Sequence, residues 1–561
     1  MKKICTIILI GLLHSGLSAD FAFDLRRAQR RVNAHTIKSE VGRVNEEVPL
    51  AIQLMNGDEQ TYADKRGSFN KALKHKDDCY PDTAAFAALV RALDSGSSAE
   101  FNAIPMGGTV RLHSPQASLA FSLDGNDGWI RTISPAPAFG SAQTASEMVE
   151  NYWSALIRDV TFADFGTNAG TDTDGYTTMA VNDLNTMSDF RGPKVNGAVT
   201  IGTFLRGNTA GDLVGPYISQ FLYLDVPMGP YIIKQQVEER ASGENFMKTS
   251  ATVKNILNGG TSSEMITLPT MLRYIITPRD LTEYVHKDFP CSGGMNAGLI
   301  LQGWVSSVGT QVLDANHPYL NNPTQIGFVT YGITELMALV EEASFEAMKA
   351  AWYQKWQVNR RLRPEEFGFY VNEQQNGAQL GIHGDLMNSP VLGIMNTAGG
   401  TNMGGNGVGA GYFLNQAYRE GCPIHPSYPA GHATFIGAGV TILKAWFNED
   451  YEIPQQTGTL PNQTRMAVTP NPSGSALIGY TGDTLTIGGE LNKLASNIAI
   501  GRNIAGVHYR SDGWDGMLLG EKVAIDVLNN YGYLFNEDFK GFSLTTFEGN
   551  KIIVGAKQAV Q

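Results

Sequence analysis

Residues 425–432 read His-Pro-Ser-Tyr-Pro-Ala-Gly-His and stand directly before a run, 433–447, in which apolar residues recur at helical spacing. Pro429 suits the first turn of a helix, and Gly431 lets another group approach the backbone closely. The first N–H groups of a helix have no partner inside it and, with the helix dipole, favour an anion. His432 lies on the same turn. The segment predicts a helical fold in which one helix start binds an anion beside an imidazole.

Three further segments, 142–159, 334–356 and 491–504, show apolar residues at helical spacing. Strand patterns are few and short, and we expect them near the ends of the chain. The chain therefore falls in the all-α class. Its 561 residues exceed one ordinary domain. Because the residues that carry chemistry follow residue 265, we expect an N-terminal helical domain over 20–265 and a catalytic helical domain over 266–561.

A second segment, 355–364, supplies cations. Lys355 shares the apolar face of its helix, so its ammonium leaves that helix on the buried side. Pro364 disfavours helical geometry at Arg363, so we expect the helix to end there. Arg360 and Arg361 are interpreted as solvated or salt-bridged surface residues.

A third segment, 501–512, adds Arg502, His508 and Asp512. On one continuous helix Arg502 and His508 would diverge by about 120°, but Gly506 offers a break that brings both toward a common centre. Asp512 follows His508 by four residues and is expected to orient local structure.

These residues form a basic pocket in an acidic chain. The net charge is −12, which disfavours general nucleic-acid binding. Guanidinium groups bind tetrahedral oxyanions through paired, charge-assisted hydrogen bonds. One imidazole can bond the central atom and the other can move protons. We therefore expect an oxyanion site.

The N-terminal residues 1–19 have the organisation of a secretory signal, with two lysines, a short apolar stretch and a small-residue cleavage site before Asp20. No stretch is long enough for a membrane span. We expect an exported protein, periplasmic or secreted. Cys79, Cys291 and Cys422 remain, which permits one internal disulfide at most. Asp172 and Asp174 hint at a structural calcium, although a plain turn is favoured because the spaced acidic loop is incomplete.

The three segments resemble the vanadium-dependent haloperoxidases, specifically the bromoperoxidases of marine algae and related bacterial enzymes. The likeness lies in Lys355 with Arg363-Pro364, in 429–432, and in Arg502 with His508 and Asp512. It extends to the segments 135–137, 152–160, 206–217 and 279–281, and so to most of the mature chain. The resemblance implies two antiparallel helical bundles and a homo-oligomer.

The resemblance also implies a cofactor and its binding residues. Vanadate would be bound through His508 as the single protein ligand of vanadium, with Lys355, Arg363, Arg502 and the Gly431 N–H at its oxygens. Vanadium would stay in oxidation state V as a Lewis acid.

Roles in the reaction follow from the same likeness. His432 would be the acid–base residue, and Lys355 would polarise hydrogen peroxide. A halide would be oxidised to hypohalous acid, which halogenates small organic acceptors. His425 favours bromide and iodide over chloride. An acidic residue is expected to pair with Arg502, with Asp288 preferred and Asp280 as the rival.

One position departs from the family pattern. Ala430 stands where the family has serine, so one hydroxyl donor to vanadate is missing. A charge-assisted hydrogen bond is worth about 1.5–3 kcal/mol, so vanadate affinity falls roughly ten- to a hundredfold unless Ser427 or water replaces the donor.

Two alternatives share the same constellation. Acid phosphatases of the type-2 phosphatidic acid phosphatase group use the corresponding histidine as a nucleophile toward phosphate. Chain length, His425 and the long insertions between the motifs favour the peroxidase. A non-catalytic, exported oxyanion-binding protein is the third reading.

Overall fold

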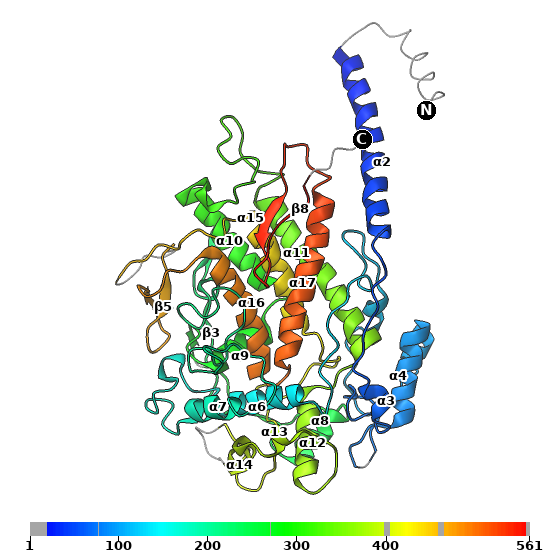
Figure 1. The fold of residues 1–561 in the computed structure, drawn as a ribbon, viewed down its shortest axis with the longest axis vertical. Helices are drawn as coiled ribbons and strands as arrows, with labels where there is room; N and C mark the ends of the chain where they lie inside the picture. Colours follow the sequence, from blue (N-terminus) through cyan, green and yellow to red (C-terminus); the bar gives the residue numbers. More distant parts are fainter. Residues whose placement is uncertain (1–18, 77, 270, 398–403, 458–464, 557–561) are drawn as a thin grey trace.

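The computed structural model describes residues 19–76, 78–269, 271–397, 404–457 and 465–556 of the chain. Of the predicted signal segment 1–19, residues 1–18 lie outside the described residues. Within this part the protein is mainly helical (Figure 1). The α-helices are α2 (Ala19–Glu46), α3 (Asp58–Thr61), α4 (Thr83–Ser95), α5 (Ser98–Asn102), α6 (Ala142–Leu156), α7 (Tyr176–Leu184), α8 (Ser250–Leu257), α9 (Pro278–Lys287), α10 (Ser292–Val308), α11 (Ile333–Tyr353), α12 (Pro364–Gln375), α13 (Gly384–Met387), α14 (Pro390–Thr397), α15 (Gly431–Trp446), α16 (Ile487–Ile504) and α17 (Arg510–Tyr531).

The strands of the described chain form four separate antiparallel pairs. They are β1 (Val226–Met228) with β2 (Tyr231–Ile233), β3 (Val237–Glu238) with β4 (Leu272–Arg273), β5 (Val468–Pro470) with β6 (Leu477–Gly479), and β7 (Phe542–Thr545) with β8 (Lys551–Val554). The all-α class is thus confirmed. The expectation that strands lie near the chain ends is wrong for β1–β4, because these two-residue and three-residue ribbons close long loops in the middle of the chain.

Helix α15 is the centre of the helical bundle and packs mainly against α17 and α11, with α10 and α16 beside them (Figure 1). All of its residues except His432 are buried. Glycines permit the close crossing of α15 and α17: a Cβ on Gly437 would lie 2.6 Å from the Met517 carbonyl oxygen, and one on Gly520 would lie 2.1 Å from that of Thr434. The bundle therefore holds the start of α15 in one place relative to its neighbours.

A second group of helices lies across the lower end of the bundle in Figure 1, where α6 contacts α7, α13, α14 and α16. Helix α6 starts with a side-chain cap, because the Ser141 hydroxyl accepts the Thr144 N–H at 3.2 Å. One continuous apolar core joins both halves of the sequence, for example Trp153 and Phe221 with Trp446. The domain boundary at residue 265 stays a prediction.

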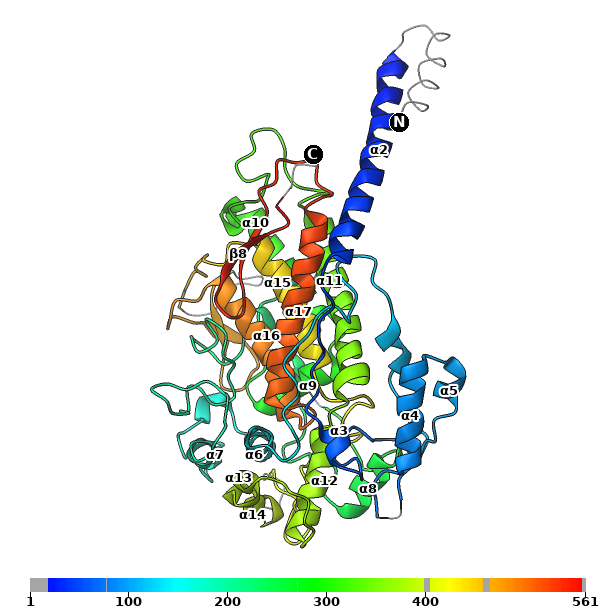
Figure 2. The same ribbon diagram turned by 45° about the vertical axis from the view of Figure 1, so that its right-hand side comes forward.

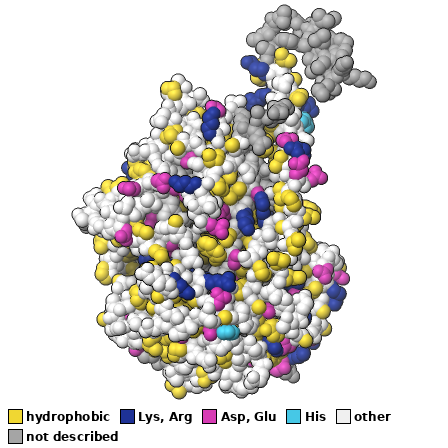
Figure 3. All heavy atoms as spheres, in the orientation of Figure 1, with side chains coloured by type: hydrophobic (Ala, Val, Ile, Leu, Met, Phe, Trp, Pro, Cys, Tyr) yellow, Lys and Arg dark blue, Asp and Glu magenta, His cyan; other side chains and the backbone are white. Residues whose placement is uncertain are grey.

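Helix α2 projects away from the rest of the molecule in both views (Figures 1 and 2). It carries exposed Phe23, Leu25 and Val32. None of the described helices is both long enough and apolar enough to cross a membrane. On the face drawn in Figure 3, cationic and acidic side chains are interspersed, so this face offers no continuous basic field for a polyanion.

Candidate active site

Lys355 lies where α11 passes into a wider π-helical turn, Gln354–Asn359. Its side chain is fully buried, and its ammonium donates to the carbonyl oxygens of Pro426 and Ser427 at 2.8 Å each. No carboxylate of the described chain forms an ion pair with it. Burial, and then the neighbouring Arg363, hold the pKa of Lys355 well below its usual value. The ammonium is therefore short of negative charge.

Arg363 begins the next helix rather than ending the previous one. The π turn ends at Asn359, Arg360 adopts a left-handed φ of 38°, and Arg363 is the extended residue before Pro364. The expectation that the helix reaches Arg363 is wrong, because the chain reverses at Arg360 to start α12. The Arg363 guanidinium, 0% exposed, donates to the carbonyls of His425 (2.8 Å) and Val507 (2.7 Å) and to neutral imidazole nitrogens. It also has no carboxylate partner among the described residues.

His508 follows the predicted break. Helix α16 ends at Ile504, Gly506 takes a φ of 85°, and α17 starts at Arg510. The Nδ1 of His508 lies 2.8 Å from the Oδ2 of Asp512, and its Nε2 lies 2.9 Å from the Nη1 of Arg363. Because arginine only donates, Nε2 carries a lone pair and Nδ1 carries the proton. His508 therefore presents the nitrogen that a metal centre can bind.

Asp512 orients His508 as the sequence predicted. It belongs to the first turn of α17, where its Oδ2 also accepts the backbone N–H of Tyr509 at 3.1 Å. Ser427 donates to the same oxygen and lies 3.5 Å from the Nδ1 of His508. Ser427 thus faces the protonated side of the imidazole, where its hydroxyl is already bonded to Asp512.

Arg502 lies in the last turn of α16 and donates to the carbonyl oxygen of Val285 at 2.6 Å. Its buried Nε has no hydrogen-bond partner in the described protein. The predicted pairing with Asp288 or Asp280 is wrong. Asp280 binds Arg273 within its own helix-start network, and Asp288 binds a histidine. A buried guanidinium with a free donor requires an acceptor that the protein does not provide.

Asp288 binds His432 instead. Asp288 directly follows α9, and its Oδ1 lies 3.0 Å from the Nε2 of His432 in the first turn of α15. Burial, followed by Arg502, lowers the pKa of His432, while the Asp288 carboxylate opposes that shift. The His432 side chain is 25% exposed, which makes it the most accessible of the three clustered histidines. The pair can hold and exchange a proton at the solvent side of the site.

The start of α15 has no side-chain cap. Helix α15 begins at Gly431, and Ala430 is its N-cap. Pro429 therefore lies just before the helix and not in its first turn, where the sequence placed it. A Cβ on Gly431 would lie 3.3 Å from the Trp352 ring and 3.5 Å from Met348, so glycine permits their close approach. The uncapped N–H groups leave donors for an anion.

His425 closes another side of the site. It is 8% exposed, its Nδ1 accepts from the Nη2 of Arg363 at 3.0 Å, and burial with Arg363 lowers its pKa well below the usual value. Its ring lies 4.8 Å from that of Trp352 and 5.7 Å from that of His113. His113 and Trp352 were not among the predicted site residues. No sequence signal links His113 to the motifs, whereas Trp352 lies one helical turn before Lys355.

Arg361 is a buried residue that sequence reasoning misassigned to the surface. It is 3% exposed rather than solvated, and it pairs with Asp512 at 2.7 Å and with Glu147 at 3.2 Å. Its guanidinium lies 3.8 Å from the Tyr509 ring centroid. Arg360 is also buried, at 8%, and pairs with Glu59. The surface interpretation fails because the chain reversal at Arg360 turns this stretch inward.

The structure thus places Arg363 at the Nε2 of His508, with Lys355 and Arg502 near enough to lower the pKa of that imidazole as well. Electrostatic coupling links them, since Arg363 and Arg502 both lower the pKa of Lys355. Like charges at such proximity repel, and a small oxyanion would offset both that repulsion and the orphaned donors. Among the described residues, no group of three or more His, Cys, Asp or Glu is arranged to hold a metal ion. The site therefore suits an anionic group bound through one imidazole.

The calcium hint is not supported. The carboxylate of buried Asp172 accepts the Thr177 N–H and hydroxyl, while Asp174 is exposed. Cys79, Cys291 and Cys422 are buried and free.

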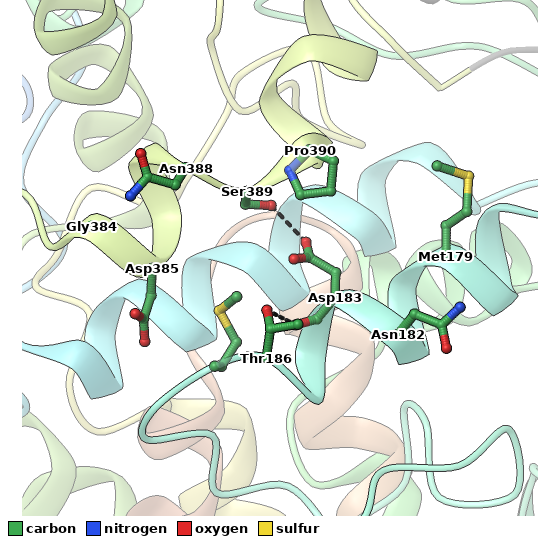
Figure 4. A pocket seen from close by; sticks show the side chains of 10 residues that line it. Met179, Asn182, Asp183, Thr186, Gly384, Asp385, Asn388, Ser389 and Pro390 are labelled. Carbon is green, nitrogen blue, oxygen red and sulfur yellow. Dashed lines mark hydrogen bonds between the residues drawn. The ribbon is translucent and has the colours of Figure 1, made fainter.

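A pocket of about 580 Å³ lies between α7 and the α13–α14 region (Figure 4), where Asp183 accepts a hydrogen bond from Ser389. None of the predicted site residues lines it.

Comparison with known proteins agrees with this geometry. The family model described as the VCPO second helical-bundle domain matches residues 399–537. A vanadium-dependent bromoperoxidase of Ascophyllum nodosum is 33% identical over 517 residues, which cover 89% of this chain and 88% of that protein. One of Corallina officinalis is 31% identical, over 86% of this chain and 90% of that protein.

A solved structure shows the same likeness in three dimensions. The homohexameric second vanadate-dependent bromoperoxidase of Ascophyllum nodosum superposes with a TM-score of 0.84 at 26% identity, covering 94% of this chain and 90% of that one. The identity, the coverage and the shared helical-bundle domain lead to one conclusion: this chain belongs to the family of the vanadium-dependent bromoperoxidases.

Proposed function

We propose that the protein oxidises bromide and iodide with hydrogen peroxide, using vanadate as cofactor, and that the hypohalous acid formed halogenates small organic acceptors. The observation that carries the proposal is the cluster of three buried cations without carboxylate partners beside the lone pair of His508. Membership of the bromoperoxidase family supports the choice of halide.

The residues present fit vanadate. His508 would bind vanadium through Nε2, since Asp512 holds the proton on Nδ1. Lys355, Arg363 and Arg502 would hold the oxygens of vanadate. The buried Nε of Arg502, which has no hydrogen-bond partner among the described residues, would donate to one of them. When bound, vanadate supplies a Lewis-acidic vanadium(V) centre that activates peroxide toward halide. The protein contributes positive charge that is already in place before the reaction.

His432 is the proposed acid–base residue. Asp288 binds its Nε2, so the Nδ1 remains for exchange with the reacting oxygen. The partial exposure of His432 connects it to solvent, from which peroxide and halide arrive. Lys355 would polarise the peroxide through its Nζ, which carbonyl oxygens hold in place without neutralising its charge.

His425 is proposed to favour bromide and iodide over chloride. Its neutral ring lies between Arg363 and the Trp352 and His113 rings, a soft and polarisable wall. Large halides gain more from such a wall than chloride does, since they shed water more readily and are more polarisable.

The location and assembly of the protein are further parts of the proposal. The signal-like segment 1–19 supports export to the periplasm or the medium. The related enzyme of Ascophyllum nodosum is a homohexamer, which supports a homo-oligomer here.

The test is reconstitution. Protein stripped of vanadate is titrated with orthovanadate, and bromination of monochlorodimedone is followed with peroxide and chloride, bromide or iodide. We expect a rate that saturates with vanadate, requires peroxide, and is supported by bromide and iodide more than by chloride. Hydrolysis of 4-nitrophenyl phosphate that vanadate inhibits, without bromination, would favour the phosphatase. Vanadate binding without either activity would favour a binding protein.

A further inference from the structure

A second pocket adjoins the proposed site and carries positive charge at its rim. It has a volume of about 360 Å³, which suits a molecule of one or two rings. Its walls are the loop 110–113, the end of helix α8 with the residues that follow it (256–262), and the loop 419–424. Its lining combines apolar Val110, Ile256 and Ile424 with the hydroxyls of Thr261 and Ser262.

Two arginines at this pocket have no acidic partner in the described chain. Arg111 donates only to carbonyl oxygens of its own loop, with the Thr109 oxygen at 2.7 Å. Arg419 is exposed and forms no ion pair with a described residue. In a chain of net charge −12, two unpaired guanidinium groups around one hollow are a local exception. They present donor pairs that match a carboxylate.

The remaining charged groups of the pocket each have a partner elsewhere in the fold. Lys71 is 1% exposed and pairs with buried Glu365 at 2.6 Å. Glu420 lies 2.6 Å from the Nε2 of His286, whose ring stacks on Tyr418 at 3.8 Å. Glu420 keeps its negative charge but is bonded to His286, and Lys71 is balanced by Glu365. Arg111, Arg419 and Glu420 therefore leave the lining with a net charge of about +1.

The pocket and the oxyanion site share a wall. His113 lines the pocket, and its ring lies 5.7 Å from that of His425, which bonds Arg363. The His113 backbone N–H donates to Ile424 at 2.9 Å, and the Trp352 indole donates to the His113 carbonyl at 3.1 Å. A molecule in the pocket would thus lie one side chain away from the site where halide is oxidised.

We infer that this pocket binds the organic acceptor and selects phenols that carry a carboxylate. The apolar lining would take the ring, and Arg111 with Arg419 would take the carboxylate. The reaction is aromatic substitution by hypobromous acid. A C–Br bond forms as the O–Br bond breaks, the C–H bond then breaks, and its proton joins the released hydroxide as water. This inference rests on the proposed function for the supply of hypobromous acid, but the binding itself does not.

Binding can be tested without turnover. Vanadate-loaded protein, without peroxide or halide, is titrated calorimetrically with 3-(4-hydroxyphenyl)propionate and with its neutral amide. We expect the carboxylate to bind at least tenfold more tightly than the amide. We expect the double variant Arg111→Gln/Arg419→Gln to lose this preference. Both arginines are exposed, so folding should be unaffected.

The matched control is Arg30→Gln, which removes the same charge from the exposed arm α2, and it should keep the preference. Equal affinity for acid and amide, no binding of either, or unchanged preference in the double variant would overturn the inference. Bromide oxidation in the absence of an organic acceptor, read as tribromide, should be the same in all three proteins. If even the wild type formed no tribromide, the proposed function would fail. The binding result would still show whether the pocket prefers the carboxylate to the amide.

Binding should also appear in the kinetics. At fixed concentrations of bromide and peroxide, the double variant should have a higher KM for the carboxylate phenol than the wild type has. The KM for the amide should be the same in both proteins. A diffusible hypobromous acid that brominates both phenols without saturation would contradict a bound acceptor.

Discussion

Arg361 and Arg363 stand two residues apart, both are almost fully buried, and their surroundings are opposite. Arg361 belongs to an acid-paired side, with Asp512 and Glu147 as partners. Arg363 belongs to a side that we call acid-free because its cations form no ion pair with a described residue. Lys355 and Arg502 are its cationic neighbours, and Asp512 attracts Arg363 only from a distance. Burying a charge without a partner costs free energy. We therefore infer that the acid-paired side stabilises the fold and that the acid-free side binds an anionic ligand. Burial alone would not have distinguished them.

The acid-paired side should matter most for stability. Arg361→Met leaves two buried carboxylates without a cation, which costs about 3–5 kcal/mol. We expect urea unfolding of vanadate-free protein to show a loss of this size. Arg191→Met, at an exposed pair with Asp189, is the control and should change stability by less than about 0.5 kcal/mol. A loss no larger than in the control would remove the distinction between the two sides.

The ligand nitrogen should matter most for vanadate. His508→Ala removes the only proposed bond from protein to vanadium, and we expect vanadate affinity to fall more than a hundredfold, since losses around metal ligands alone reach about 10–100-fold. Equilibrium dialysis of vanadium measures this directly. His383→Ala, at a partly exposed histidine beside Asp385, should bind vanadate normally. Tight binding in His508→Ala would place the ligand elsewhere.

Two buried lysines sharpen the comparison. Lys355→Met should lower vanadate affinity about a hundredfold, because a charge-assisted hydrogen bond of roughly 1.5–3 kcal/mol is lost. Its effect on apo stability should be smaller than that of Arg361→Met. Lys444 is equally buried but lies 3.8 Å from Glu521, so Lys444→Met should reduce stability and leave vanadate affinity unchanged. The reverse pattern would contradict the assignment of the acid-free side.

Two buried histidines, His425 and His508, predict a pH dependence of the apo protein. Burial and neighbouring cations hold the pKa values of His425 and His508 below the ordinary ~6.5. The unfolded chain therefore binds more protons between about pH 5 and 6.5, and stability rises with pH across this range, by up to about 1.4 kcal/mol per unit and histidine. Chemical unfolding at a series of pH values measures it. A flat profile would mean that folding does not lower these pKa values, and a falling profile that folding raises them.

The smallest expected effect is a gain. Ala430→Ser restores a hydroxyl at the N-cap of α15, where it would cap the helix for about 1 kcal/mol and donate to vanadate. We expect affinity to rise about tenfold and apo stability to rise slightly. Ala430→Cys, of similar size but a weak donor, should not improve affinity. Unchanged affinity in Ala430→Ser would show that the hydroxyl does not reach the anion.

Much of the helical framework could be predicted because long apolar periodicity survives in the fold. Helix α15 begins at Gly431 and α16 ends at Ile504, close to the expected limits, and Gly506 breaks the chain as predicted. The site residues Lys355, Arg363, Arg502 and His508 converge because their motifs sit at helix ends. Element ends depend on local backbone rules, which sequence carries.

The pairing of charges could not be predicted in the same way. Asp288 was expected at Arg502 and lies at His432, and Arg361 was expected in solvent and lies in the interior. These errors have one cause: which acid meets which base depends on how separate helices cross, and that geometry is set by packing over the whole core.

The chain's own residue order determined the helices, the acidic overall charge and the three cation- and histidine-bearing segments, because periodicity and turn chemistry act over a few residues. Only the tertiary structure decided that Arg363 lacks an acid while Arg361 has two, and that His113 joins a neighbouring pocket to His425. Coulombic and desolvation energies depend on distances between segments far apart in sequence, and those distances exist only in the folded chain.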